Sequence, residues 1–292
     1  MDKTLRIIEK HGAFRAFIAD TTELVNKATK IHNLSPVAAA AMGRTLTAAS
    51  IMGLDLKDNS ETLSIQIDGN GPLGNIVTVS DYKGNVRGYI DNPNVDLPLK
   101  SNNKLDVASA VGIGCLTIVK YMGMKEPYVG RVELQTSEIA EDIAYYFATS
   151  QQTPSVVALG VLVDTDYSIK AAGGYIIQLL PGADEDMISK LEANVYTLET
   201  MTEMLDKGYD VYRIAKELFL GIDFEILTDS VPEYKCNCSK EKMDKNLISL
   251  GEKELKDIID EQGEAELNCH FCKSVYKYSK QDLENLLLSA KG

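Results

Sequence analysis

Hydrophobic and polar positions alternate in the middle of the chain, and this alternation predicts β-strands. Leu63, Ile65 and Ile67 are separated by polar residues, as expected for a strand with one buried face. Further short apolar runs, bounded by glycine, asparagine or aspartate turns, predict strands at 76–79, 86–90, 156–163 and 175–180. The first three strands follow one another at hairpin spacing, so we expect an antiparallel meander.

Two helices are predicted in the same part of the chain. One begins at Ser35-Pro36, an N-cap residue followed by proline at the first helical position, and continues through small residues to about Met52. The other begins near Ser137. Its apolar residues at helical spacing are Ile139, Ile143 and Tyr146.

After Pro181-Gly182 the hydrophobic period changes to three or four residues, which predicts an amphipathic helix. We expect one helix over 184–206, with an acidic face opposite its apolar stripe, and a second, shorter helix at about 211–218. The apolar stripe consists of Met187, Leu191, Val195, Leu198, Met201 and Leu205. By itself such a stripe indicates ordinary core packing.

These patterns predict an α+β protein of three parts. Residues 1–182 form a core domain with an antiparallel sheet and packed helices. Residues 183–231 form an acidic helical linker. Residues 232–292, which follow Pro232, form a small domain that contains four of the five cysteines.

Composition and charge reduce the number of functional classes to which the chain can belong. The 292 residues are 45% hydrophobic and 25% charged, which is ordinary for a globular protein. The net charge is −13, and the linker alone carries −8, so nucleic-acid binding is disfavoured. No apolar run approaches the roughly 18 residues of a membrane span, and the first residues lack the apolar segment of a secretory signal. We therefore expect a cytosolic protein without a membrane partner.

The four clustered cysteines predict a metal site. Cys236 and Cys238 form one close pair, and Cys269 and Cys272 form another after 30 intervening residues. Two such pairs can bind one tetrahedral Zn²⁺, so we expect one zinc per chain. Four sulfur ligands leave no open position for water, which argues against zinc hydrolysis or deamination. Taken alone, the set indicates a stabilising structural zinc.

The remaining candidate functional residues and motifs give no evidence of a second active or binding site. His270 lies inside the second pair, and with four sulfurs available we expect it to face solvent. The segment 69–74 matches a G-x-G-x-x-G pattern, but a strand follows it, so we expect a hairpin and no dinucleotide site. Cys115 is expected to be a small buried apolar residue. No Ser/His/Asp set can be identified, and we expect no enzymatic activity.

The chain resembles the 33-kDa heat-shock chaperone family, the redox-switched holdases of the bacterial cytosol. The resemblance covers the whole chain and depends on both cysteine pairs, on the run 171–182 (AAGGYIIQLLPG) and on Met42-Gly-Arg-Thr45. It also includes Leu105-Asp106-Val107 and the strand segment 69–74.

The resemblance implies an ATP-independent chaperone of the stress response that is inactive while it is reduced and zinc-bound. It implies that oxidation expels zinc and forms Cys236–Cys238 and Cys269–Cys272 disulfides. The tail and linker then unfold, and the protein dimerises and binds unfolding client proteins.

Two other functions remain open at this point. One is a zinc-stabilised adaptor whose four cysteines are purely structural. The other is a thiol oxidoreductase, which would need its Cys-x-x-Cys at a helix N-terminus in a thioredoxin-like setting. We instead expect Cys269 in a strand–turn.

Overall fold

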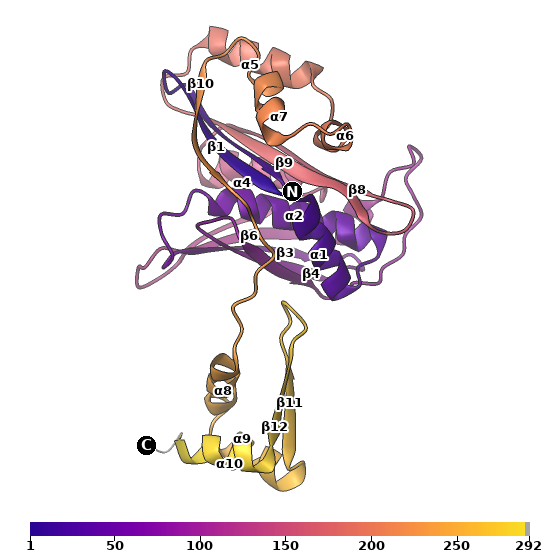
Figure 1. Cartoon of the computed structure of the whole chain (residues 1–292), viewed down its shortest axis with the longest axis vertical. Coiled ribbons are helices and arrows are strands. Elements are labelled where there is room, and N and C mark those ends of the chain that lie inside the picture. Colours follow the sequence, from indigo (N-terminus) through magenta and orange to yellow (C-terminus); the bar gives the residue numbers. More distant parts are fainter. Residues whose placement is uncertain (290–292) are drawn as a thin grey trace. The chain divides into compact units, whose positions relative to one another are not determined.

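Alternating apolar residues build two five-stranded sheets in the first part of the chain (Figure 1). The computed structural model describes residues 1–289, in two units: Met1–Lys235 and a second unit from Cys236 onward. The strands of the first unit are β1 (Lys3–Glu9), β2 (Phe14–Asp20), β3 (Thr62–Gly69), β4 (Asn75–Asp81), β5 (Val86–Ile90), β6 (Gly114–Tyr121), β7 (Tyr128–Glu133), β8 (Ser155–Val163), β9 (Ile169–Leu179) and β10 (Phe224–Ser230). Its helices are α1 (Thr22–His32), α2 (Pro36–Gly53), α3 (Val107–Val111), α4 (Ala140–Ser150), α5 (Glu185–Thr197), α6 (Met201–Asp206) and α7 (Val211–Leu218).

Both sheets are antiparallel throughout. The first sheet has the order β10-β1-β2-β9-β8, and the second has the order β5-β4-β3-β6-β7. The predicted meander is confirmed as β3, β4 and β5, and the strand predicted at 86–90 has those bounds. The predicted α+β class with packed helices is likewise confirmed.

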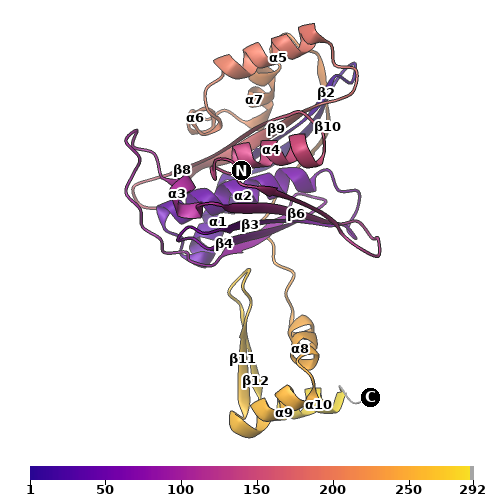
Figure 2. The same ribbon diagram turned by 180° about the vertical axis from the view of Figure 1, so that it is seen from behind.

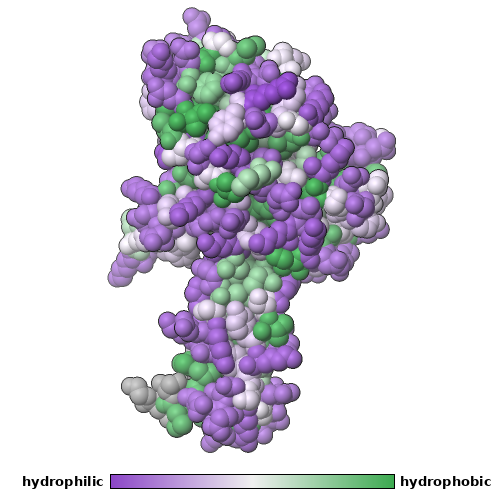
Figure 3. All heavy atoms as spheres, viewed as in Figure 1, coloured by the Kyte–Doolittle hydropathy of each residue, from purple (hydrophilic) through white to green (hydrophobic). Residues whose placement is uncertain are grey.

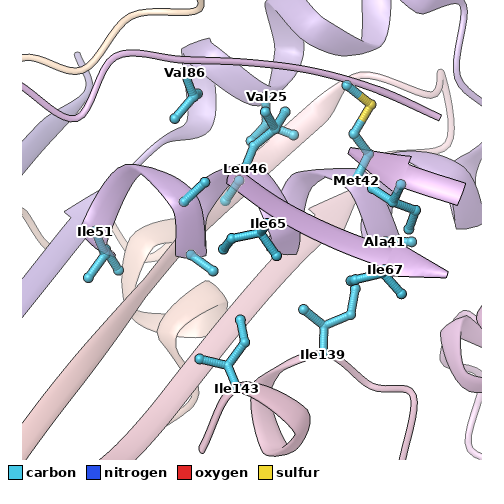
Figure 4. Close-up of a cluster of buried hydrophobic side chains, with 14 of the residues drawn as sticks. Val25, Ala41, Met42, Leu46, Ile51, Ile65, Ile67, Val86, Ile139 and Ile143 are labelled. Carbon is cyan, nitrogen blue, oxygen red and sulfur yellow. The ribbon is translucent and has the colours of Figure 1, made fainter. Parts of the chain in front are cut away.

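Helix α2 lies between the two sheets and forms the centre of the first unit (Figures 1 and 2). It begins at Pro36 as predicted, and nearly all of its residues are buried because both sides are covered. At Gly43 the packing leaves no room for a side chain: a Cβ atom would lie 2.7 Å from Val25 and 2.8 Å from Val161. Figure 4 shows Met42 and Leu46 of α2 among isoleucines from β3 and α4.

The other face of the first sheet is covered by α5, α6 and α7, and a second apolar cluster fills this interface (Figure 1). Leu191 of α5 and Ile214 of α7 are buried there, and the Phe219 ring lies 4.9 Å from the Phe14 ring. At Gly173 of β9 a Cβ atom would lie 2.8 Å from the Leu205 side chain, so α6 packs directly against backbone.

The prediction of one continuous helix over 184–206 was wrong. The chain is extended at Leu198, and α6 starts again after Thr200. The Thr200 hydroxyl accepts from the backbone N–H of Glu203, and the Glu203 carboxylate accepts from the backbone N–H of Thr200. This capping box stabilises a new helix start. The shorter helix predicted at 211–218 is confirmed as α7.

The second unit is small and has its own apolar cluster. Its elements are α8 (Lys240–Ser249), α9 (Glu252–Glu261), β11 (Glu264–Asn268), β12 (Val275–Ser279) and α10 (Lys280–Ser289). The buried residues of the cluster are Leu247, Leu255, Ile259, Tyr278 and Leu283. Strands β11 and β12 form an antiparallel hairpin. A unit of this size with so few buried side chains gains little stability from apolar burial alone.

Candidate metal centre

An extended segment and a turn hold the four clustered cysteines. Cys236 and Cys238 lie in the extended segment just before α8. Cys269 and Cys272 lie in the turn between β11 and β12. The Cys269 N–H donates to the Ser274 carbonyl (2.9 Å), and its carbonyl accepts from the Lys273 N–H (2.8 Å). The predicted strand–turn setting of Cys269 is therefore confirmed, and it lacks the helix N-terminus that a thioredoxin-like motif needs.

The four sulfur atoms converge on one point. The Sγ atoms of Cys236 and Cys269 are 3.7 Å apart, those of Cys238 and Cys272 are 3.3 Å apart, and all four lie within 4.8 Å of one another. Zinc–sulfur bonds of about 2.3 Å place the sulfurs of a tetrahedral site about 3.8 Å apart. The spacing and the donor set therefore fit a single tetrahedral zinc ion.

Burial and hydrogen bonding act in opposite directions on these thiols. Burial raises the pKa of Cys236 to about 12 and also raises that of Cys269. Burial likewise opposes ionisation of Cys272, but hydrogen bonds from Ser274, together with those from Cys238 and Cys269, outweigh it and lower the pKa of Cys272 to about 7. Backbone hydrogen bonds from Cys272 and Phe271 act against burial and lower the pKa of Cys269. A bound dication would hold such thiols in the thiolate form.

Two residues that the sequence analysis missed lie beside the sulfurs. The Tyr276 hydroxyl donates to Cys238 Sγ (3.1 Å), and this contact is the main reason that the pKa of Tyr276 rises to about 12. Ser274 Oγ lies 3.2 Å from Cys272 Sγ. The alternation of β12, with Tyr276 and Tyr278 on one face and Val275 and Lys277 on the other, could have indicated Tyr276.

The other candidate residues lie apart from this cluster. His270 is exposed, as predicted, and the metal-holding group found among the described residues contains only the four cysteines. The segment 69–74 joins β3 to β4, which confirms the hairpin.

The prediction that Cys115 is buried was wrong. Leu116 and Ile118 of β6 are buried, so Cys115 lies on the other face of the strand, where it is only partly buried and where its thiol raises the pKa of Arg131.

Fold and site together define a class: a two-unit α+β protein whose small second unit carries a closed four-thiol centre suited to zinc. Comparisons with known proteins give the family. The family model described as Hsp33 protein matches residues 2–279. The chain is 50% identical over 289 residues to the 33 kDa chaperonin of Clostridium perfringens, covering 98% of this chain and 91% of that protein. The chain belongs to the Hsp33 family of chaperones.

Two further relatives agree with this assignment. The 33 kDa chaperonin of Ruminiclostridium cellulolyticum is 46% identical over 286 residues, which cover 98% of each chain. The crystal structure of the 33 kDa chaperonin from Thermotoga maritima matches with a TM-score of 0.89 at 35% identity, covering 98% of each chain. Among residues 1–289, every helix is too short or too polar to cross a membrane.

Proposed function

We propose that this chaperone is an ATP-independent holdase, inactive while reduced and zinc-bound, and activated when oxidation of its four clustered cysteines releases the metal. The convergence of the four sulfurs in a unit with a very small apolar core carries the proposal. Loss of one ion should then unfold the unit.

In the reduced state, one zinc per chain binds Cys236, Cys238, Cys269 and Cys272. Structural zinc contributes about 10–16 kcal/mol in small finger peptides, which exceeds the stability of many whole domains. The five buried side chains of its apolar cluster cannot replace that contribution. Oxidation removes the thiolate ligands and with them most of the folding free energy of the second unit.

In the oxidised state, Cys236 bonds to Cys238 and Cys269 bonds to Cys272. In the reduced site, the sulfur contacts of 3.7 Å and 3.3 Å join Cys236 to Cys269 and Cys238 to Cys272, so these contacts run between the pairs and do not favour this pairing. Chain connectivity favours it once the unit unfolds, because closing a loop of a few residues costs less entropy than closing one of more than thirty.

Unfolding of the second unit then releases the linker. The helices α5, α6 and α7 cover apolar residues of the first sheet, and their own apolar side chains are buried against it. Their departure exposes both surfaces together. Exposed apolar surface of this extent binds unfolded proteins and also promotes self-association, so unfolding clients bind and the activated chain forms a homodimer.

In this proposal 1–182 is the client-binding core, 183–231 is the releasable linker and 232–292 is the zinc-binding switch. The protein acts in the cytosol without nucleic acid or membrane, as a chaperone and not as an enzyme. The excess of acidic residues, which is greatest in the linker, supports the exclusion of nucleic acid.

Titration with peroxide tests the proposal. Zinc release, measured with a chromogenic chelator, should rise together with the ability to suppress aggregation of a heat-unfolded client. The variant Cys238→Ser/Cys269→Ser should contain no stoichiometric zinc and should no longer respond to peroxide. If peroxide releases zinc and aggregation is unchanged, the protein is the zinc-stabilised adaptor with purely structural cysteines.

A further inference from the structure

A short segment just before the first cysteine pair adds to the edge of the second sheet. Tyr234 forms an isolated parallel bridge with Val86 of β5, which is an edge strand of this sheet. The Val86 N–H donates to the Glu233 carbonyl (2.9 Å), and the Val86 carbonyl accepts from the Lys235 N–H (2.8 Å). The Glu233 N–H donates to the Asn85 side chain (3.1 Å). Three main-chain groups of the segment are therefore satisfied by the β4–β5 hairpin.

The Tyr234 side chain enters the core beside this edge and is only 3% exposed. Its hydroxyl donates to the Gly88 carbonyl (2.8 Å), accepts from the Gly88 N–H (3.3 Å) and lies 2.9 Å from His32 Nε2. One hydroxyl thus satisfies both outward-facing backbone groups of Gly88 together with a buried imidazole. We name the site that receives the Tyr234 side chain, formed by His32, Val86 and Gly88, the tyrosine socket.

Side chains alternate along the segment. Pro232 and Tyr234 are buried, whereas Glu233 and Lys235 are exposed. An extended peptide that adds to a sheet edge has this character: its backbone supplies affinity, and alternate side chains fill pockets. The segment is therefore bound as a peptide ligand would be, although it belongs to the same chain.

An unpaired strand edge is a template for other extended chains. Without the segment, the backbone groups of Val86 and Gly88 and the imidazole of His32 would lose the partners described above. Only one residue, Lys235, separates Tyr234 from Cys236, so unfolding of the second unit removes the fixed attachment on one side of the segment.

We infer that the tyrosine socket and the β5 edge form a peptide-binding site for extended segments of unfolded proteins that carry a tyrosine, and that 232–235 is its resident occupant in the reduced chain. The inference rests on the proposed function, in which the second unit unfolds and clients are captured. A tethered occupant has an effective concentration in the millimolar range, so the site is closed to other peptides while the segment stays bound.

A peptide-binding assay with the reduced, zinc-loaded full chain tests the site. The probe is a fluorescent peptide that copies 231–238 with serine at both cysteine positions, and the matched probe has alanine in place of the tyrosine. The variant Tyr234→Ala should bind the tyrosine probe at least tenfold more tightly than the parent does, and at least tenfold more tightly than it binds the alanine probe. The control variant Tyr196→Ala removes a side chain that is 91% exposed and should behave as the parent.

Folding is checked through the thermal transition of the first unit. If Tyr234→Ala abolishes this transition, Tyr234→Phe is used in its place, because it keeps the ring and removes only the hydroxyl. The Tyr234→Phe variant should still bind the tyrosine probe more tightly than the parent does. Equal affinity of a folded Tyr234→Ala variant for the two probes, or no binding of either, overturns the site.

The link to clients is tested separately. The tyrosine probe, but not the alanine probe, should restore client aggregation in the presence of the oxidised parent protein. If the oxidised parent suppresses aggregation and neither probe competes, the inference fails while the proposed function stands. If Tyr234→Ala binds the tyrosine probe and oxidation activates nothing, the proposed function fails while the site stands.

Discussion

Asp2 fixes the start of a helix from a distant point in the sequence. Its carboxylate accepts hydrogen bonds from the backbone N–H groups of Glu23 (2.8 Å) and Leu24 (2.7 Å) in the first turn of α1. Burial raises its pKa to about 6, against the opposing effect of these two hydrogen bonds. The folded state therefore binds a proton more readily at this site than the unfolded chain does.

The consequence is a measurable pH dependence. A carboxyl group with a raised folded pKa stabilises the fold below its unfolded pKa of about 4, and that contribution is lost as the pH rises towards 6. We therefore compare the unfolding free energies of the parent and of Asp2→Asn. The difference, parent minus variant, should fall as the pH rises from 4 to 7, by at most about 3 kcal/mol. Denaturant titrations of the first unit at three pH values measure this difference.

Asp58→Asn is the matched control. Asp58 is exposed, and hydrogen bonds from Ser60 lower its pKa, so its small contribution has the opposite sign: it is lost only below about pH 4 and should stay constant between pH 4 and pH 7. A difference for Asp2→Asn that stays constant across the range would show that burial does not control this carboxylate.

The fifth cysteine provides a second test at this scale. Peptide mapping of the oxidised protein should find Cys236–Cys238 and Cys269–Cys272 as the main disulfides, with Cys115 reduced. Cys115 lies on β6 in the first unit, far in sequence from the other four cysteines. A disulfide to any of them would therefore require a large loop to close. A main product that joins Cys238 to Cys272, which are close together in the reduced site, would contradict the proposed pairing.

At the scale of elements, local patterns were predictable and long-range pairings were not. The N-cap and proline of α2 and the turns of the β3–β5 meander are local signals, and they gave nearly correct bounds. The break between α5 and α6 was missed because apolar spacing continues across it, although Thr200 and Glu203 carry the capping-box signature. The edge pairing of β1 with β10 joins residues more than two hundred positions apart, which no local period can indicate.

The linker helices can be tested by one buried charge. Leu191 is 3% exposed in the interface between α5 and the first sheet, so Leu191→Glu places an unpaired carboxylate against apolar side chains. Truncation of such a leucine costs about 2–5 kcal/mol, and a buried charge costs more. We expect this variant to suppress client aggregation under reducing conditions, with zinc still bound at about one per chain.

The matched control lies on the same helix. Tyr196 is 91% exposed, so Tyr196→Glu adds the same charge without disturbing the interface and should remain inactive when reduced. If limited proteolysis shows the linker of Leu191→Glu to be free and aggregation is still not suppressed, linker release is not the activating step.

At the scale of the whole molecule, the two units differ in what stabilises them. The first unit has extensive apolar clusters on both faces of the first sheet, whereas the second has one small cluster and four converging thiols. The grouping of the four thiols was predictable because cysteine pairs at short spacing are a local signal. Their surroundings, such as the Tyr276 contact with Cys238, depend on the β11–β12 register and were not.

Removal of zinc without oxidation should lower the unfolding free energy of the second unit and leave that of the first unit unchanged. A strong chelator added to the reduced protein should abolish hydrogen-exchange protection from Cys236 onward and leave the protection of α2 unchanged. The reason is that, in the proposed mechanism, the ion supplies most of the stability of the second unit. Full protection of α9 in metal-free protein, confirmed by elemental analysis, would contradict this dependence.

The path of the linker bears on how quickly the switch can reset. Helices α5 to α7 run between β9 and β10, and both strands belong to the first sheet, with β10 at its edge. While β10 stays paired with β1, the released helices form a loop closed at both ends. Rebinding of such a loop is unimolecular, so its rate after reduction should not depend on protein concentration. Once β10 also leaves the edge, only β9 anchors the linker, and recovery should become slower and compete with association between chains.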